Sequence, residues 1–334
     1  METGRFAPSP TGRMHLGNVY AALMSWLSVK SKEGQWILRI EDIDEGRSRR
    51  EYAMLIEDDL RWLGLEWDAG GYDGKMPDHT PCRQSLRHSL YEEALCRLAS
   101  TRLLYGCGCR RADIMATQAP HQSDGRIVYA GTCRPGAEPP FPVVDADMLL
   151  KERKACRIYV PDADIEFEDG LYGIQRVNLA RHCGDFVLRR ADGAWAYQLA
   201  VVVDDAMMGI TEVVRGSDLL LSAAQQIYLN RLLGFEPPRY IHIPLLCNSS
   251  GQRLSKRDSS LSMEELRRRH TPGKILGSLA RLAGIVEDEK DYQASDLLDI
   301  IRDGSRDWRA SLCRNYKDGG KTPPVQLHID CCRL

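Results

Sequence analysis

The sequence has no long hydrophobic run and no targeting pattern at its N-terminus. No apolar stretch approaches the roughly 20 residues that a membrane-spanning helix needs. Met1 precedes polar and charged residues, without the basic and apolar segments of a secretory signal. We therefore expect no membrane contact and a cytoplasmic location. The 11 cysteines are an odd number and are scattered, so we expect them to be reduced thiols.

An excess of charge of one sign is also missing. The 45 basic and 47 acidic side chains leave a formal net charge of -2. This balance excludes a uniformly basic coat for nucleic acid but leaves room for a basic patch. Internal repeats and low-complexity segments are absent as well. The 334 residues, 43% of them hydrophobic, are enough for two or three folded domains.

Helical and strand-like patterns alternate along the chain. Near the N-terminus, apolar spacing predicts one strand at residues 35–40 and three helices, at 16–32, 48–63 and 85–104. Further along we expect strands at 185–188, 195–203 and 239–246 and helices at 217–233, 262–285 and 294–303. Strands that alternate with helices are typical of a parallel α/β sheet.

The composition changes between about residues 105 and 181. Cysteine, proline and glycine become frequent, and short strand-like runs appear at 157–160 and 174–177. We interpret this segment as an inserted domain. The predicted division is a first core half at 1–104, the insertion at 105–182, a second core half at 183–261, a helical region at 262–290 and a tail at 291–334. Within that tail, residues 317–324 have the composition of a flexible segment.

The segment from Arg5 to Asn18 combines a strand end, a Pro-Ser-Pro turn, two glycines and a helix start. A helix N-terminus presents backbone N–H groups and partial positive charge to an anion, so this order predicts a phosphate site. His15 is placed to donate to a phosphate oxygen, and Gly17 leaves room for a flat base. Far downstream, Lys256 lies in a loop rich in Ser and Gly that suits a triphosphate. A lone His or Lys would ordinarily be a structural or solvated residue, so the prediction rests on the pair.

These two motifs resemble the signature motifs of class I aminoacyl-tRNA synthetases. The residue sequence of the first motif is similar to that of the glutamyl branch. The segments Arg39–Asp44, Tyr197–Asp205 and Glu212–Asp218 are similar to it as well. The resemblance covers roughly residues 4–285. It implies an α/β fold with a Rossmann-type parallel-sheet catalytic core, an inserted α+β domain and a short helical C-terminal region. It also implies an ATP-dependent ligase that forms an aminoacyl-adenylate with the help of Mg²⁺.

The number of residues that follow the loop with Lys256 indicates which branch of the family the chain resembles. A full glutamyl-tRNA synthetase carries a separate helical anticodon-binding region there, whereas only residues 258–334 follow here. The chain is similar to the short paralogues, which activate L-glutamate without tRNA and transfer it to queuosine in the anticodon of tRNA(Asp). We expect a monomer with L-glutamate, ATP and queuosine-containing tRNA(Asp) as partners. The alternatives are a truncated glutamyl-tRNA synthetase that charges the 3′ end of tRNA(Glu) and a non-catalytic tRNA-binding paralogue.

Glutamate needs fixed cations for its two carboxylates and an anion for its ammonium group. Arg5 and Arg215 are the candidate cations and Glu41 the candidate anion, because a guanidinium binds a carboxylate through two parallel hydrogen bonds. Ser9 and Tyr197 add hydroxyls. The resemblance implies the same five, with backbone from Phe6, Ala7 and Pro8, and an ATP site comprising His15, Gly17, Asn18, Ser255, Lys256 and Arg257. His15 and Lys256 are the predicted catalytic pair. Pairing of Arg215 with Asp218, or a core role for Tyr197, is the structural alternative for those residues.

The cysteines of the insertion indicate a metal site. Cys107 and Cys109 are followed, about twenty residues later, by Cys133, and zinc takes four such ligands in a tetrahedron. The resemblance supplies Tyr129 as the fourth ligand, whereas His121 is the chemically commoner choice. We expect one structural Zn²⁺; three unmetallated thiols are the alternative.

Two further groups have no unique interpretation from sequence. The adjacent Asp204 and Asp205 could bind a metal, although we favour a structural or substrate-orienting role. Six arginines are candidates for contacts with RNA phosphates, and each could equally be a solvated charge: Arg102, Arg110, Arg111, Arg267, Arg268 and Arg269.

Overall fold

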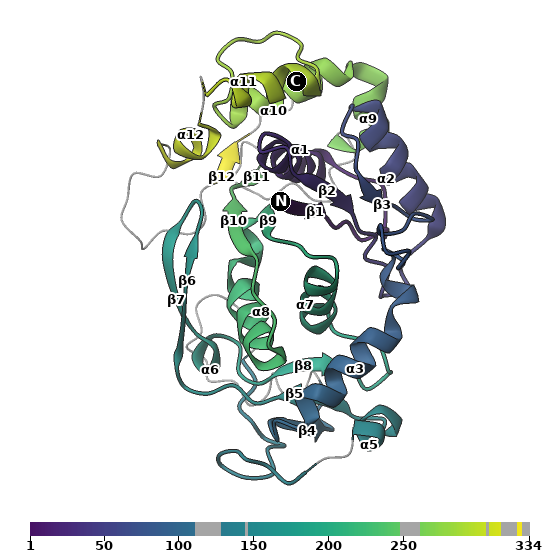
Figure 1. The fold of residues 1–334 in the computed structure, drawn as a ribbon, viewed down its shortest axis with the longest axis vertical. Helices are drawn as coiled ribbons and strands as arrows, with labels where there is room; N and C mark the ends of the chain where they lie inside the picture. Colours follow the sequence, from purple (N-terminus) through teal and green to yellow (C-terminus); the bar gives the residue numbers. More distant parts are fainter. Residues whose placement is uncertain (111–127, 144–145, 248–260, 305–306, 315–325, 329–334) are drawn as a thin grey trace.

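A seven-stranded sheet forms the centre of the molecule (Figure 1). The structure is a computed structural model that describes residues 1–110, 128–143, 146–247, 261–304, 307–314 and 326–328. The strand order is β3-β2-β1-β9-β10-β6-β7, and every neighbouring pair is parallel except the hairpin β6–β7. The strands are β1 Thr3–Phe6, β2 Gln35–Leu38, β3 Ala69–Gly70, β6 Asp164–Asp169, β7 Gly173–Asn178, β9 Glu212–Gly216 and β10 Arg239–Ile243.

Helices cover both faces of this sheet. Side chains alternate along a strand, so Trp36 and Leu38 enter one hydrophobic cluster while Ile37 enters the other. The first cluster contains α1 Leu16–Lys30, α2 Arg50–Trp62, α9 Met263–Arg269, α10 Pro272–Leu282, α11 Ala294–Arg302 and α12 Trp308–Arg314. The second contains α3 His88–Ala99, α7 Tyr197–Met207 and α8 Leu220–Leu233. Burial on both faces explains the continuous apolar runs of the parallel strands.

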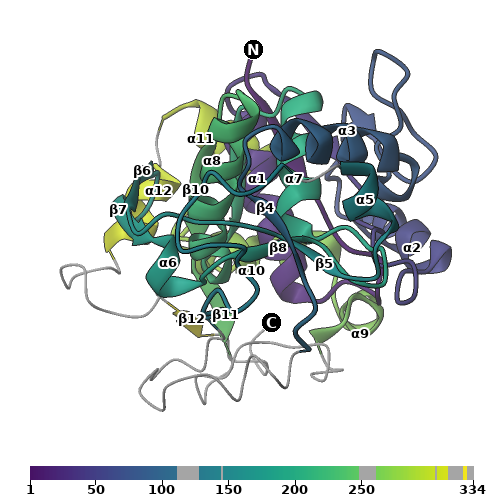
Figure 2. The same ribbon diagram turned by 90° about the horizontal axis from the view of Figure 1, so that it is seen from below.

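A smaller antiparallel sheet lies at one end of the molecule, at the bottom of Figure 1 and towards the viewer in Figure 2. It consists of β4 Leu104–Cys107, β5 Ala155–Ile158 and β8 Phe186–Arg189. The short helices α5 Ala146–Lys151 and α6 Leu179–His182 belong to the same part of the chain. The buried carboxylate of Asp185 connects this sheet by accepting hydrogen bonds from Arg134, the Tyr105 hydroxyl and the Val160 amide.

The expected fold class is confirmed, and several local predictions are corrected. Residues 195–203 were expected to form a strand, but α7 occupies 197–207. The helix expected over 85–104 ends at Ala99, and Leu104 belongs to strand β4. The predicted boundaries of the insertion do not follow the sheets. β6 and β7 lie within 105–182 but extend the large sheet, whereas β8 lies beyond residue 182 and completes the small one.

The C-terminal region returns to the core. The helix expected at 294–303 is present as α11. The last strand of the described residues, β12 Gln326–His328, pairs in parallel with β11 Leu245–Cys247. The segment expected to be flexible, 317–324, lies outside the described residues. Across the described parts of the chain, no helix combines the length and the apolar character that crossing a membrane requires.

Candidate functional site

A cavity of about 500 Å3 opens where the carboxyl ends of β1 and β9 meet. The chain leaves β1 towards β2 on one side, and β9 lies on the other, so this is the point at which the strand order reverses. Open parallel sheets bind ligands at such a switch point. Every described residue predicted to bind glutamate or ATP lines this one cavity: Arg5, Phe6, Ala7, Pro8, Ser9, His15, Gly17, Asn18, Glu41, Tyr197 and Arg215.

The first turn of α1 forms one wall of the cavity. His15 caps the helix: its Nδ1 accepts a hydrogen bond of 3.1 Å from the Gly17 amide. A neutral ring therefore carries its hydrogen on Nε2, as donation to an anion requires. A Cβ at position 17 would lie 3.0 Å from the His15 ring, so Gly17 permits this cap as well as leaving space for a ligand. The Asn18 side chain accepts from the His15 amide at 3.1 Å and completes the capping box.

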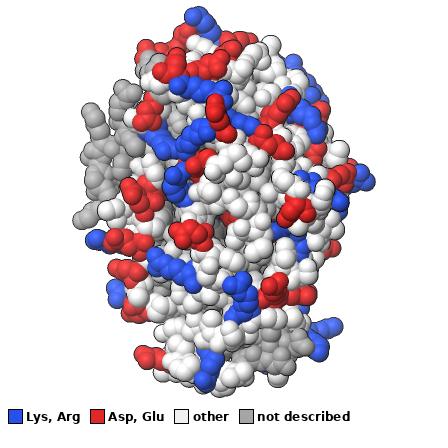
Figure 3. Space-filling model, viewed as in Figure 1, with Lys and Arg blue, Asp and Glu red and all other residues white. Residues whose placement is uncertain are grey.

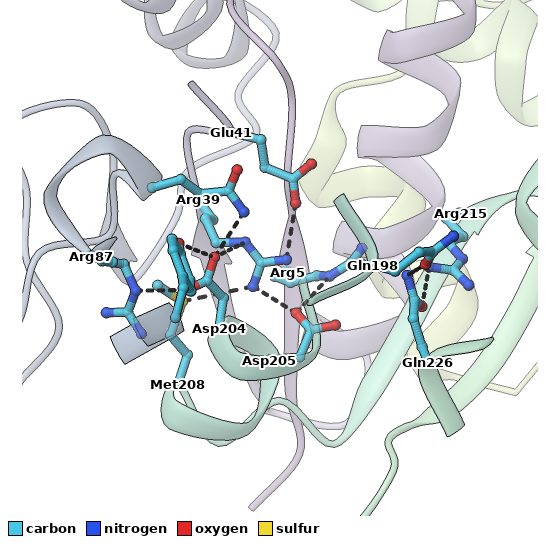
Figure 4. Close-up of polar contacts among 12 residues, drawn as sticks. Arg5, Arg39, Glu41, Arg87, Gln198, Asp204, Asp205, Met208, Arg215 and Gln226 are labelled. Carbon is cyan, nitrogen blue, oxygen red and sulfur yellow. Dashed lines mark hydrogen bonds and ion pairs between the residues drawn. The ribbon is translucent and has the colours of Figure 1, made fainter. Parts of the chain in front are cut away.

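Arg5 belongs to a buried cluster of charged residues, which Figure 4 shows. Its Nε donates to Asp205 at 3.3 Å. Arg39, directly after β2, donates to Asp205 at 2.6 Å and to Glu41 at 3.1 Å. Asp204 lies 3.9 Å from Arg39 and also pairs with Arg87, so three guanidinium groups and three carboxylates balance one another. Burial raises the pKa of Asp205, but Arg39 and Arg5 outweigh that effect and hold the pKa below its usual value.

Glu41 enters the cavity from the carboxyl end of β2. Its amide donates to the Pro8 carbonyl at 3.0 Å, which fixes the backbone beside the β1–α1 turn. Burial raises the pKa of the Glu41 carboxyl, although Arg39 and Arg5 oppose the shift. A ligand ammonium would add the positive charge that this buried carboxylate favours.

Arg215, near the end of β9, has different surroundings. Its Nε contacts His242 at 3.0 Å, one terminal nitrogen donates to Gln226 at 2.8 Å, and the other donates to the Leu219 carbonyl at 3.3 Å. All three partners are uncharged acceptors. The expected alternative, a pair between Arg215 and Asp218, is therefore not the arrangement found. A guanidinium has five N–H groups, so one hydrogen on each terminal nitrogen is left for a carboxylate in the cavity.

Asp204 and Asp205 both bind side chains of the protein. Asp204 is fully buried and accepts hydrogen bonds from Gln84 at 2.8 Å and Arg87 at 2.7 Å, as well as from the Tyr91 hydroxyl. It connects α7 to α3, while Asp205 orients Arg5. Among the described residues, the one cluster with metal-binding spacing lies elsewhere, in the insertion.

Comparison with known proteins agrees with this geometry. A family model of the catalytic domain of class I tRNA synthetases (E and Q) matches residues 3–302. The chain is 45% identical over 308 residues to the glutamyl-Q tRNA(Asp) synthetase of Nitratidesulfovibrio vulgaris, and the match covers 90% of this chain and 92% of that one. The chain belongs to the glutamyl-Q tRNA(Asp) synthetase family. It is therefore a ligase with a class I synthetase catalytic domain.

Other relatives of the glutamyl-Q tRNA(Asp) synthetase family extend this result. The Symbiobacterium thermophilum protein of that name is 44% identical over 305 residues, covering 90% of this chain and 92% of that one. Among solved structures, a glutamate tRNA ligase from Elizabethkingia meningosepticum in complex with its amino acid matches with a TM-score of 0.76 and 25% identity. That match covers 99% of this chain and 68% of the ligase.

The cysteine cluster of this family member lies at the end of the small sheet. The sulfur atoms of Cys107, Cys109 and Cys133 all lie within 4.8 Å of one another. The Tyr129 hydroxyl faces them: it accepts from the Cys133 amide at 2.7 Å and from the Cys107 thiol at 3.5 Å. Burial raises the pKa of the Cys133 thiol, but hydrogen bonds from Tyr129 and Cys109 outweigh it and lower the pKa to about 7. The Arg157 guanidinium lies 3.8 Å from the centre of the Tyr129 ring. Burial and the hydrogen bonds with Cys107 and Cys133 raise the pKa of the Tyr129 hydroxyl.

The arginines proposed for RNA contacts are largely engaged within the protein. Arg267 pairs with Asp58 and with Asp59, the latter at 2.8 Å. Arg268 and Arg269 pair with carboxylates of their own helix, α9. Arg102 donates to the Phe141 carbonyl at 2.7 Å. The ion pairs of α9 offset the positive charge of its arginines, whereas Arg102 contacts a neutral carbonyl.

Some predicted residues lie outside the described parts of the chain: Ser255, Lys256, Arg257, Arg111 and His121. Their roles stay predictions. Sequence reasoning missed three residues that hold the site together, namely Arg39, Gln226 and His242. Arg39 begins one of the segments that resembles the glutamyl branch, which was a usable signal. Gln226 and His242 lie in an ordinary helix and strand and carry no local signal.

Proposed function

We propose that the chain activates L-glutamate with ATP, without tRNA, and transfers the glutamyl group to queuosine in tRNA(Asp). The charge arrangement of the cavity carries the first part of this proposal. Arg5, Arg39, Glu41 and Asp205 are neutral as a set. Arg215 adds a positive charge whose direct partners among the described residues are neutral groups. Glutamate, with two carboxylates and one ammonium, has the complementary net charge. Glutamine would place a neutral amide against a buried cation, which costs binding free energy.

The proposed first step is an in-line displacement at the α-phosphorus of ATP. The α-carboxylate of glutamate forms a new bond to phosphorus and pyrophosphate leaves with its electron pair, giving glutamyl-adenylate. Such reactions need positioning and charge stabilisation more than covalent chemistry. His15 Nε2–H and the N-terminus of α1 would face the phosphates, and Mg²⁺ would offset their charge. A hydroxyl of queuosine would then attack the acyl carbon and release AMP.

The acceptor part of the proposal is supported by the names of the relatives. The proteins that match over about nine tenths of this chain are named for tRNA(Asp) and not for tRNA(Glu). A truncated glutamyl-tRNA synthetase and a non-catalytic paralogue are the competing interpretations. The intact set of charged residues in the cavity argues against the second.

Pyrophosphate exchange tests the activation step directly. Purified protein with glutamate, ATP and labelled pyrophosphate, but no tRNA, should incorporate label into ATP. Glutamine and aspartate should give little exchange at equal concentration. If exchange with glutamate is absent, or needs tRNA, the proposed activation is wrong.

We further propose one structural Zn²⁺ bound by Cys107, Cys109, Cys133 and Tyr129. Three thiols and a phenol hydroxyl at a common point fit a closed four-coordinate site. The metal would connect the end of β4 to the loop that carries Tyr129 and Cys133, without a position open for chemistry. Metal analysis of the purified chain tests this site.

A further inference from the structure

Three neighbouring strands each place one polar side chain in a row that begins at the wall of the cavity. Arg215 of β9 lies opposite His242 of β10 in the strand register. His242 in turn contacts Asp169 at the end of β6, with Nδ1 2.6 Å from the carboxylate. His242 is fully buried, and Asp169 is 2% exposed. Only Arg215 lines the cavity; the other two lie behind it.

The direction of the hydrogen bonds in this row follows from the chemistry of its members. Arg215 Nε carries a hydrogen and cannot accept, so His242 Nε2 must be the acceptor of the 3.0 Å contact. The ring hydrogen then lies on Nδ1 and is donated to Asp169. A second hydrogen on His242 would place two donors against each other. Burial and the charge of Arg215 lower the pKa of His242, whereas Asp169 opposes that shift.

Asp169 is itself held rigidly by the backbone. It accepts from the amides of Leu171 at 3.0 Å and Tyr172 at 2.9 Å, and from the His242 amide at 3.1 Å. Its position is therefore set by the turn between β6 and β7. The carboxylate is separated from Arg215 by the imidazole, so it fixes the tautomer without forming an ion pair with the guanidinium.

The opposite side of Arg215 is held by amides. Gln226 accepts from the guanidinium and donates to Gln198 at 3.0 Å, next to Tyr197 at the start of α7 (Figure 4). The Tyr240 ring packs against both His242 and Arg215. It is stacked with His242, at 6.0 Å between ring centroids, and the Arg215 guanidinium lies 4.9 Å from its centre. No carboxylate contacts Arg215 directly among the described residues.

We propose that His242 and Asp169 are a positioning pair for Arg215. They hold its Nε with a neutral acceptor of fixed tautomer, so the guanidinium keeps its orientation and its full charge for a substrate carboxylate. This proposal rests on the proposed glutamate activation and adds two residues to it. A direct carboxylate at position 242 would instead neutralise Arg215 and compete with the substrate. The pair therefore contributes to glutamate affinity while touching neither substrate.

The test measures separate KM values for glutamate and ATP by pyrophosphate exchange. His242→Leu removes the acceptor with a similar volume, and we expect the glutamate KM to rise about 10- to 100-fold, as for a lost hydrogen bond to a charged group. The ATP KM should stay within about twofold, since the ATP contacts are unchanged. His242→Gln restores a neutral acceptor and should recover most of the glutamate affinity. His182→Leu, at an exposed histidine of α6, is the matched control and should leave both KM values near those of the wild type.

The outcomes separate the two proposals. Wild-type protein without glutamate-dependent exchange would reject the proposed function itself. Active wild type with equal rises of both KM values in His242→Leu, or with no rescue by His242→Gln, would reject the positioning role. If His242→Leu does not fold, Asp169→Asn decides: it keeps an acceptor for the backbone amides but weakens the preference for one tautomer. A severalfold rise in the glutamate KM alone supports the proposal, and an unchanged value contradicts it.

Discussion

Arg5 and Arg215 are equivalent candidates in the sequence but differ in their contacts. Arg5 shares Asp205 with Arg39, so part of its charge is already balanced. Arg215 contacts an imidazole, an amide and a backbone carbonyl. A substrate carboxylate therefore gains more from Arg215, because no carboxylate in the described part of the chain contacts this guanidinium directly.

Replacement of Arg215 by lysine should show this difference. A lysine cannot satisfy His242 and Gln226 and also offer two parallel hydrogen bonds to a carboxylate. We expect Arg215→Lys to lower kcat/KM for glutamate about 100-fold, mostly through KM, in pyrophosphate exchange. Arg231→Lys, on an exposed position of α8, is the matched control and should behave as the wild type. A loss of less than about threefold in Arg215→Lys would contradict the assignment.

Glu41 should make glutamate binding sensitive to acid. Its pKa is raised by burial, so the carboxylate is lost at a higher pH than an ordinary glutamate. The protonated form no longer attracts the ammonium group. The glutamate KM should therefore rise as the pH falls, and the rise should begin at a higher pH than the titration of an ordinary glutamate would give. The ATP KM serves as the internal control. Glu41→Gln should have a high glutamate KM throughout and no such rise, and a variant that keeps the wild-type profile would exclude Glu41 as its origin.

At the level of elements, the sequence predicted the parts of the core that have a local signal. α1, α8 and α11 follow their apolar spacing, and β2 and β10 follow their buried runs. Residues 195–203 were misassigned because the run Leu199–Val203 is continuously apolar, and such a run does not distinguish a buried strand from a buried helix. The helix is specified by what packs around it: Asp204 joins α7 to α3, and Asp205 joins it to Arg5.

The pairing of strands could not be read from the sequence. β8 completes the small sheet and the hairpin β6–β7 extends the large one, although their order in the chain suggests the reverse. Pairing depends on residues far apart in the chain. Asp169 could not be identified from the sequence for this reason. It lies behind the substrate cavity because β6 pairs with β10.

The cysteine cluster gives a prediction for the small sheet. Zinc binding contributes directly to folding where it connects separate segments. The wild-type protein should contain about one zinc per chain, and Cys133→Ser should lose most of it and unfold at a temperature lower by roughly 5 °C. Cys96→Ser, at an exposed cysteine outside the cluster, should keep both the metal and the stability. Metal analysis and thermal unfolding decide this, and zinc-free wild type would reject the site.

At the scale of the whole molecule, acidic and basic side chains are interspersed over the face shown in Figure 3. This pattern agrees with the small net charge. The arginines of α9, each paired with a carboxylate, are one example of it. The described residues on the face in Figure 3 therefore do not form one broad positive surface for RNA. Under the proposed function, activation of the amino acid would depend instead on the cavity between β1 and β9, which Arg5, Glu41 and Arg215 line.

The identity of the acceptor is the central claim, and transfer of labelled glutamate to tRNA(Asp) tests it most directly. Two preparations are compared, one with queuosine and one from cells unable to make it, and the labelled RNA is digested to separate the anticodon fragment from the 3′ end. The proposed function predicts label only in the queuosine-containing tRNA and only in the anticodon fragment. Equal labelling of both preparations, or label at the 3′ end, would contradict it.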